Sequence, residues 1–493
     1  MAEQAGVASA APTSLAGLWA RARRIPPELV CFTLVAGAYA VHFLLSGYDS
    51  FYYDAANYWQ LGDRFNHNGH FSLVAYDSPW RGYSMPLLNH VLKVIASAGG
   101  LGAVTIVKIF GALLAATLGV VVIPRLARQL FPAAAIGPGR VLALNTFIFL
   151  YWRDHFGFPL SDFPALLVVM IGVLGLLRAT TAGYLVCGLC FGLAANIRPA
   201  YLLAAIAAAV VAGLLPLQGW DWRRRSAAAT LVLAGLLVAS LPQMLINHHQ
   251  RGSWSPLIPK AQEITQLQLW QGMRAQKYET YVGSAAGYSQ PDVFYLDPAT
   301  QHVLEKQHIS PVAHYYVGFT YIEFPGYGKY VRMVIHDPAE MAAGYGRRLF
   351  NGLDVQYPTP YIRDLGDRSI LVSLLEYTLI FLAIARLVVT EARRTLGRIR
   401  WSGIVLLLIP CATAVTGAVE PRFFLPLQML ICMLVCFGPA TRPSLLGGGS
   451  GRRVGLAVSY VAFLLVCLML SSATLAQLEH PGPTLGSGAV ERG

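Results

Sequence analysis

Long apolar segments separated by short polar connections dominate the chain. The hydrocarbon core of a bilayer is about 30 Å thick, so a helix that crosses it needs roughly 20 mostly apolar residues. About eleven segments approach this pattern, near residues 29–47, 102–123, 140–153, 160–178, 181–197, 199–217, 227–246, 369–389, 401–418, 422–438 and 454–476. The pattern predicts an all-α polytopic membrane protein with about eleven transmembrane helices.

The first long polar segment, about residues 48–100, carries a helical signal of its own. After Asp54, the residues Tyr58, Leu61 and Phe65 recur at positions i, i+3 and i+7. This spacing is typical of an amphipathic helix that lies at a bilayer surface. We therefore expect interfacial helices in this first outer loop.

The second long polar segment, about residues 247–368, is rich in Tyr, Pro and Gly. Helical patterns occur near 260–275 and 336–350. A segment of this length is too long for a passive connection, so we expect a small mixed external insertion. The chain is expected to divide into a cytoplasmic N-terminal segment, an N-terminal transmembrane module that includes the first outer loop, the insertion, a C-terminal transmembrane module and an external tail. These parts cover residues 1–28, 29–246, 247–368, 369–476 and 477–493.

Composition agrees with this class. Only 13% of the residues are charged, and the mean hydropathy is +0.51. A soluble chain of 493 residues would need a more polar surface. The net charge of +12 comes mostly from arginines beside the predicted helices, which does not indicate nucleic-acid binding.

Arginine also predicts the orientation in the membrane. It is concentrated on alternate connections, as the positive-inside rule requires of cytoplasmic loops. These arginines are Arg21, Arg23, Arg24, Arg125, Arg128, Arg140, Arg178, Arg223, Arg224, Arg225, Arg386, Arg393, Arg394, Arg398, Arg400, Arg442, Arg452 and Arg453. We therefore expect a cytoplasmic N-terminus, an external C-terminus and localisation in the plasma (inner) membrane.

Acids and arginines recur on the opposite, outer connections. Asp162 begins one predicted helix, Arg198 follows another, and Glu420 and Arg422 precede a third. Each residue alone is compatible with a helix cap or a snorkelling charge. Together with Asp54 they place charges at one depth on one face, and such charges often mark a functional site.

This set of side chains suits chemistry on a lipid phosphate. Guanidinium groups bind phosphate oxygens in a forked geometry. A nearby carboxylate can accept the proton of an acceptor hydroxyl or amine. The site would lie where a lipid-linked donor and an external acceptor meet.

The order of the motifs resembles a known family. The motifs are Asp54-Ala-Ala-Asn-Tyr, Arg81-Gly-Tyr-Ser-Met-Pro86, Asp162, Arg198-Pro and Glu420-Pro-Arg422. Over about residues 25–250 and 369–476, the chain is similar to integral-membrane glycosyltransferases of the C-type fold, which use lipid-linked sugar donors. This family includes protein O-mannosyltransferases and the aminoarabinose transferase of lipid A. Many relatives carry Asp-Glu in the first loop, whereas Ala55 follows Asp54 here, so we expect no obligatory metal and no other cofactor.

The resemblance implies a role for each candidate residue. Asp54 is expected to be the catalytic base, with Asp49 as its competitor and Asp162 as a residue that assists the base or holds the acceptor. The expected substrate-binding residues are Arg81, Arg198, Arg422, Glu420 and Tyr58, with the arginines on the donor phosphate and Glu420 orienting Arg422.

The implied function is inverting transfer of a sugar from a polyprenyl-phosphate donor to an extracytoplasmic glycan, lipid or protein in cell-envelope glycan biosynthesis. The expected partners are the lipid-linked sugar, the external acceptor and the bilayer. One alternative is a transporter or flippase of lipid-linked glycans, although the sequence has no obvious repeat and its charges gather at one surface. A second alternative is a scaffold in which these charges only tie helix ends together.

Overall fold

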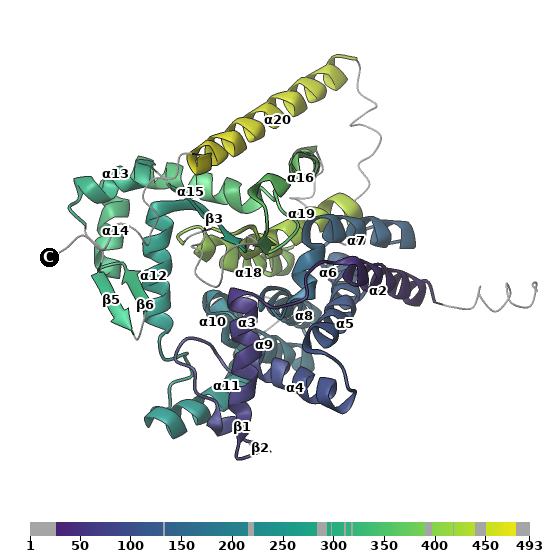
Figure 1. The fold of residues 1–493 in the computed structure, drawn as a ribbon. Coiled ribbons are helices and arrows are strands. Elements are labelled where there is room, and N and C mark those ends of the chain that lie inside the picture. Colours follow the sequence, from purple (N-terminus) through teal and green to yellow (C-terminus); the bar gives the residue numbers. More distant parts are fainter. Residues whose placement is uncertain are drawn as a thin grey trace, which may run out of the picture.

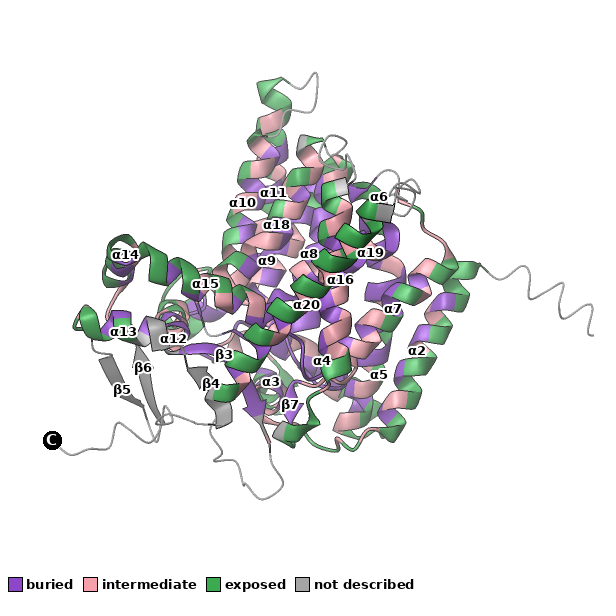
Figure 2. Ribbon diagram, turned by 90° about the horizontal axis from the view of Figure 1, so that it is seen from above, coloured by how far each residue is buried: buried purple, intermediate pink, exposed green. Residues whose placement is uncertain are grey.

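A computed structural model of the chain describes residues 26–131, 134–214, 221–282, 293–296, 298–309, 312–316, 319–389, 397–417, 419–438 and 450–479. Most of the predicted N-terminal segment and the tail from residue 480 onward lie outside these residues. The fold is predominantly helical, and the helices of the two predicted membrane modules pack side by side (Figures 1 and 2).

Every predicted apolar segment forms a helix within the described part of the chain. These helices are α2 (Pro27–Leu45), α5 (Ala103–Ala116) continued by η3 (Thr117–Val122) and α6 (Ile123–Leu130), α7 (Pro138–Trp152), α8 (Asp162–Arg178), α9 (Thr181–Ile197), α10 (Leu202–Leu214) preceded by η5 (Pro199–Tyr201), α11 (Trp222–Arg251), α16 (Ile370–Val389), α18 (Arg398–Ala414), α19 (Leu425–Phe437) preceded by η7 (Pro421–Phe424), and α20 (Ser450–Glu479).

Length and composition separate these helices into classes. Five described stretches are long and apolar enough to cross a membrane: Pro27–Leu45, Ala103–Leu130, Trp222–Arg251, Ile370–Val388 and Arg453–Ala476. Shorter apolar helices occupy Thr181–Ile197, Pro199–Leu214, Ile399–Ala414 and Pro421–Phe437. The chain therefore has the architecture of an all-α membrane protein, while the count of about eleven crossings stays a prediction.

Small residues allow the central helices to approach closely. A Cβ atom at Gly188 of α9 would overlap the carbonyl oxygen of Val232 in α11, and a Cβ atom at Gly235 would overlap the carbonyl oxygen of Leu185. Gly175 of α8 and Gly183 of α9 approach each other in the same way. Such contacts are typical of helices that associate in lipid, where dispersion contacts replace the hydrophobic effect as the driving force.

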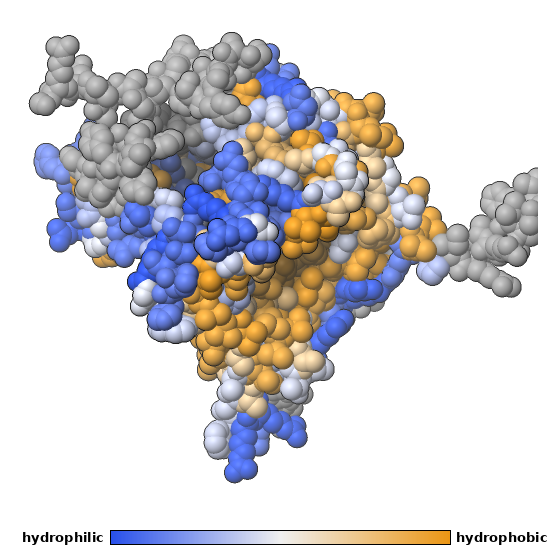
Figure 3. All heavy atoms as spheres, turned by 60° about the horizontal axis from the view of Figure 1, so that its bottom comes forward, coloured by the Kyte–Doolittle hydropathy of each residue, from blue (hydrophilic) through white to orange (hydrophobic). Residues whose placement is uncertain are grey.

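The outer surface of the helices is strongly apolar. Leu44, Leu371 and Met469 are 85%, 78% and 72% exposed. Figure 3 shows a broad apolar surface with hydrophilic surface toward both ends of the molecule. Because water would penalise so large an apolar surface, this surface fits a protein embedded in a bilayer.

The first polar loop folds largely as its pattern predicts. It contains α3 (Tyr53–Leu61), η1 (Gly62–Phe65), β1 (Asn66–His67), β2 (His70–Phe71), η2 (Leu73–Ala75) and α4 (Ser84–Ala98). Tyr58, Leu61 and Phe65 are all buried, so the apolar stripe faces the protein interior. Asp54 lies in the first turn of α3.

The insertion is mixed, as expected. Its elements are α12 (Ala261–Arg274), β3 (Ala275–Tyr281), β4 (Val293–Leu296), α13 (Pro298–Lys306), β5 (Val312–Tyr316), β6 (Phe319–Glu323), α14 (Tyr327–His336), α15 (Pro338–Leu353), β7 (Tyr361–Ile362) and η6 (Leu365–Asp367). Both predicted helices are present, as α12 and α15. The strand β3 pairs antiparallel with β4 and parallel with β7, where Thr280 lies opposite Tyr361.

Candidate active site

The ends of several helices bring charged residues from distant parts of the sequence together. Six residues form what we call the charge cluster: Asp54 of α3, Arg81 before α4, Asp162 at the start of α8, Arg198 after α9, Glu420 before η7, and Arg422 in η7. The cluster contains three carboxylates and three guanidinium groups, so its formal charges balance. The six residues contact one another, whereas their expected position at the outer membrane face stays a prediction.

Arg422 is the centre of the cluster. Its Nε and Nη2 donate to the two carboxylate oxygens of Glu420, at 2.5 Å and 3.0 Å. Its Nη1 lies 3.5 Å from Oδ2 of Asp162, and its Nη2 lies 3.7 Å from Oδ2 of Asp54. One guanidinium group thus joins all three carboxylates, and it forms a forked pair with Glu420. The orienting role expected of Glu420 stays a prediction.

The two other arginines complete the cluster. Nη2 of Arg81 donates to Oδ1 of Asp54 at 2.6 Å, and Arg198 forms an ion pair with Asp162. The Asp54 carboxylate therefore bridges two guanidinium groups, with one oxygen toward Arg81 and the other toward Arg422.

Exposure is uneven within the cluster. The side chains of Asp162, Glu420 and Arg422 are 3%, 9% and 9% exposed. Those of Arg81 and Asp54 are 30% and 40% exposed. A ligand arriving from solvent or from the bilayer surface therefore meets the Asp54–Arg81 pair first.

The electrostatic surroundings keep Asp54 ionised. Partial desolvation raises the pKa of the Asp54 carboxyl, but Arg81, Arg422 and Arg198 together outweigh this effect and hold the pKa below its usual value. In this state Asp54 is a carboxylate at neutral pH, although a weaker base than an unpaired aspartate.

Aromatic rings hold the arginines in place. The guanidinium carbon of Arg81 lies 5.0 Å from the centre of the Tyr58 ring, which places the predicted Tyr58 within the site. Phe423 lies similarly against Arg198, at 4.8 Å. Stacking on a ring limits the motion of a guanidinium group while leaving its N–H edges available.

Buried polar contacts fix the loop that carries Arg81. The backbone N–H of Ser84 donates to Oδ1 of Asn196 at 2.9 Å, and that of Tyr83 donates to Oε1 of Gln243 at 3.2 Å. A Cβ atom at Gly82 would overlap the carbonyl oxygen of Asn196. The residue after Arg81 must therefore be glycine if the loop is to dock against α9.

Tyr361 connects the insertion to α3 and was not among the residues singled out in the sequence. Its hydroxyl donates to the carbonyl oxygen of Tyr52 at 2.9 Å and accepts from the N–H of Ala55 at 3.1 Å. These two bonds position the helix turn that carries Asp54. The sequence offered only a weak signal for this residue, namely the Tyr- and Pro-rich composition of the segment that contains it.

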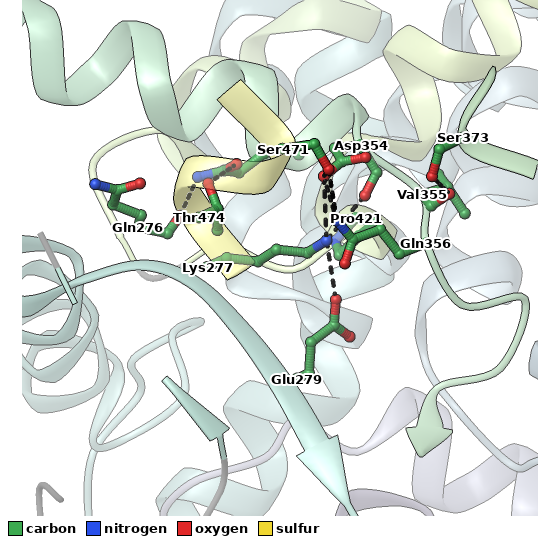
Figure 4. A network of polar contacts seen from close by, with 12 residues as sticks. Gln276, Lys277, Glu279, Asp354, Val355, Gln356, Ser373, Pro421, Ser471 and Thr474 are labelled. Carbon is green, nitrogen blue, oxygen red and sulfur yellow. Dashed lines mark hydrogen bonds and ion pairs between the residues drawn. The ribbon is translucent and has the colours of Figure 1, made fainter. Parts of the chain in front are cut away.

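A second set of buried polar groups, which we call the anchor network, surrounds Asp354 (Figure 4). It comprises Lys277 of β3, Asp354 and Gln356 after α15, Tyr377 of α16 and Ser471 of α20. Nζ of Lys277 donates to the carbonyl oxygen of Asp354 at 2.9 Å. The Asp354 carboxylate accepts from Tyr377 at 2.7 Å, from Gln356 at 2.8 Å and from Ser471 at 3.0 Å. The network fastens the insertion to two apolar helices.

Glu279 lies between the two sets of charges. The neighbouring N–H of Tyr278 donates to the carbonyl oxygen of Val419, directly before Glu420, at 2.8 Å. Oε1 of Glu279 lies 3.2 Å from Nζ of Lys277, and the side chain is only 10% exposed. Burial raises the pKa of Glu279 to about 7, with Lys277 opposing the shift and Glu420 adding to it.

Asp49 does not join the charge cluster. It is exposed and accepts a hydrogen bond from Ser50 Oγ at 3.2 Å, and among the described residues it forms no ion pair. Of the eight predicted site residues, the structure thus brings seven together and leaves Asp49 aside.

The described residues contain no group of three or more His, Cys, Asp or Glu side chains placed to hold a metal ion. The expectation that no metal is required stays a prediction. The chain matches no protein-family model and no curated protein. The resemblance to C-type-fold glycosyltransferases therefore also stays a prediction.

Proposed function

We propose that the protein is an inverting glycosyltransferase that moves a sugar from a polyprenyl-phosphate donor to an external acceptor. It would act on the extracytoplasmic side of the plasma membrane. The observation that carries this proposal is the charge cluster, in which three arginines and three carboxylates from distant segments meet at the ends of apolar helices. At this position a lipid phosphate and a water-soluble acceptor can both reach the same groups.

The arginines supply the phosphate-binding function. Arg81 is the most exposed of the three and keeps its orientation by contact with Tyr58. Arg422 lies across Asp54 from Arg81, so a phosphate bound in this place would have a guanidinium group on each side. Arg198 and Asp162 hold the neighbouring helix ends in place.

Asp54 supplies the base. The acceptor oxygen or nitrogen attacks the anomeric carbon of the sugar from the face opposite the phosphate, and its proton passes to Asp54. The bond between the anomeric carbon and the phosphate oxygen breaks, and polyprenyl phosphate leaves with the bonding electrons. Asp54 loses one negative charge while the phosphate gains one, so the charge beside Arg81 and Arg422 stays constant.

The position of the cluster favours an enzyme over a transporter. Transporter sites are commonly formed near the middle of the bilayer by interrupted helices. Here Asp162 begins α8, Arg198 caps the C-terminal end of α9, and Glu420 precedes η7. The charges thus lie at helix ends rather than halfway along the helices.

Substitution of the base tests the proposal. Asp54→Asn preserves shape but cannot accept the proton, so we expect sugar transfer to fall by about 100-fold or more. Transfer would be measured with a radiolabelled polyprenyl-phosphate sugar and a membrane fraction as acceptor source, with the full-length protein in nanodiscs. Asp49→Asn is the matched control, five residues away in the same loop, and should keep wild-type transfer. A fully active Asp54→Asn variant would remove Asp54 from the reaction.

A further inference from the structure

We propose that Asp54 occupies the position of the donor phosphate in the resting site, so that a donor binds by displacing one carboxylate and the site selects donors with a single phosphate charge. This inference rests on the proposed function and concerns the same site. It makes Asp54 both the base and an internal competitor of the substrate.

The geometry of the Asp54 carboxylate is that of a phosphate substitute. Oδ1 lies 2.6 Å from Nη2 of Arg81, and Oδ2 lies 3.7 Å from Nη2 of Arg422. The two oxygens of one anionic group thus face two separate guanidinium groups. The two non-bridging oxygens of a phosphodiester present the same arrangement and the same single charge.

The other two carboxylates of the cluster, Glu420 and Asp162, are not open to displacement. Arg422 is bound by both oxygens of Glu420, and both side chains are 9% exposed. Asp162 pairs with Arg198 and is 3% exposed. Removing either carboxylate would leave a largely buried guanidinium group, 9% exposed for Arg422 and 19% for Arg198, without its partner, which is costly. Displacing Asp54, which is 40% exposed, only moves a carboxylate toward solvent.

The surroundings of Asp54 show what displacement would do to its basicity. The charged and titratable groups that act on it are Arg81, Arg422, Arg198, Glu420 and Tyr361. The three arginines hold the pKa of Asp54 low. When a donor phosphate shares Arg81 and Arg422, this lowering weakens and Asp54 becomes a stronger base. The base would therefore be activated only when the donor is in place.

Charge balance determines the preferred class of donor. The cluster is neutral at rest, and one displaced carboxylate compensates one phosphate charge. A diphosphate-linked donor brings at least one further negative charge. Within the cluster, the one remaining guanidinium group, that of Arg198, is already paired with Asp162, and Arg422 also holds Glu420. The site should therefore prefer a polyprenyl-monophosphate sugar to a polyprenyl-diphosphate sugar.

The test is a binding measurement that needs no acceptor. A dodecyl-phosphate hexose, which carries one charge at every working pH, would be titrated onto the full-length protein in nanodiscs. Asp54→Asn should bind this diester about tenfold more tightly than the wild type, and Asp54→Ser should do the same. Asp63→Asn is the matched control, because Asp63 lies in the same loop and pairs with Lys93. It should leave the affinity unchanged.

The second arm compares the diester with dodecyl-diphosphate hexose on the wild-type protein, where we expect about tenfold weaker binding of the diphosphate. Unchanged or weaker diester binding in both Asp54 variants would overturn the competition between Asp54 and phosphate. Tighter binding of the diphosphate would overturn the assignment of the donor class. Either result can occur in a protein that transfers sugar, whereas a wild type that binds neither probe and transfers no sugar would refute the proposed function itself.

Discussion

The charge cluster and the anchor network both contain buried ionic groups, but only the charge cluster reaches the surface of the protein. Lys277 and Asp354 of the anchor network are fully buried, and neutral donors surround the Asp354 carboxylate. In the charge cluster, the Asp54–Arg81 pair reaches the surface. The second contact of Asp54, with Arg422, is long at 3.7 Å. The anchor network ties elements of the fold together, whereas the charge cluster can exchange the Asp54 carboxylate for an external anion.

The chemistry of the cations follows the same division. The ammonium group of Lys277 acts as a compact point charge at the junction of the insertion with α16 and α20. The guanidinium groups of the charge cluster present flat edges that suit two oxygens at once. We expect substitutions in the anchor network to change stability and substitutions in the charge cluster to change activity.

The largest expected effect is the loss of stability in Lys277→Met. Nζ of Lys277 also lies 3.8 Å from Oδ2 of Asp354, and both side chains are fully buried. Methionine keeps much of the side-chain volume but leaves the Asp354 carboxylate buried without this cation. Breaking a buried ion pair from one side costs about 3–5 kcal/mol, and we expect the free energy of unfolding to fall by this amount. Denaturant unfolding of the full-length protein in nanodiscs measures it.

Lys93→Met is the control for this change. Lys93 pairs with the exposed Asp63 at 2.6 Å, and such exposed pairs contribute about 0–1 kcal/mol. Adding Asp354→Asn to Lys277→Met should recover part of the lost stability, because the buried charge is then removed. Equal losses in Lys277→Met and Lys93→Met would contradict the inference that burial makes the Lys277–Asp354 contact important for stability.

A smaller effect is expected from Glu279, which lies between the two sets. Its pKa is about 7 in the folded protein and 4.5 in the reference state. Between these values the unfolded chain has released the proton that the folded protein retains, so stability falls as pH rises from about 4.5 to 7 and is constant above. Glu279→Gln should remove this decline in the free energy of unfolding, which amounts to at most about 3 kcal/mol.

The stability difference between Glu279→Gln and the wild type would be followed by chemical unfolding at a series of pH values. Glu340→Gln, an exposed position on α15 of the same insertion, is the matched control and should keep the decline that the wild type shows. Parallel curves for the wild type and Glu279→Gln would show that Glu279 titrates normally.

The smallest free-energy change is expected for Arg422→Lys, and it affects activity rather than stability. Lysine keeps the charge but cannot hold both oxygens of Glu420 while facing Asp54 and Asp162. We expect turnover to fall by about 10- to 100-fold, equivalent to about 1.4–2.8 kcal/mol, with little change in unfolding. The measurements are sugar transfer and unfolding on the same preparation. A stability loss as large as the activity loss would favour the scaffold interpretation of these charges.

Much of the helical architecture follows from local pattern. The apolar segments of the sequence coincide with helices because a backbone in lipid must satisfy its own hydrogen bonds. The buried Tyr58, Leu61 and Phe65 in the first outer loop follow from helical spacing in the same way. Local pattern could not reveal the contact of Lys277 with Asp354, since these residues are 77 positions apart. The strand pairing of β3 with β7 is likewise a contact between distant segments.

The candidate site, too, could be predicted only in part from local pattern. The common side of Asp162, Arg198, Glu420 and Arg422 could be predicted, because alternate helix ends return to the same membrane face. The family resemblance favoured Asp54 over Asp49 as the base, but local pattern alone could not separate them, since both lie at the start of the same loop and carry the same side chain. Their difference arises from packing, because Tyr361 holds the start of α3 so that Asp54 reaches Arg81 while Asp49 stays at the surface.

The sequence by itself determined the membrane class, the helical segments and the common face of the charges, because hydropathy and helix length are local properties of the chain. The tertiary structure alone decided which acid meets which arginine, which pair stays open and which lysine is buried. These outcomes depend on side-chain contacts between segments far apart in the chain, where a shift of a few ångströms changes an ion pair into a solvated charge.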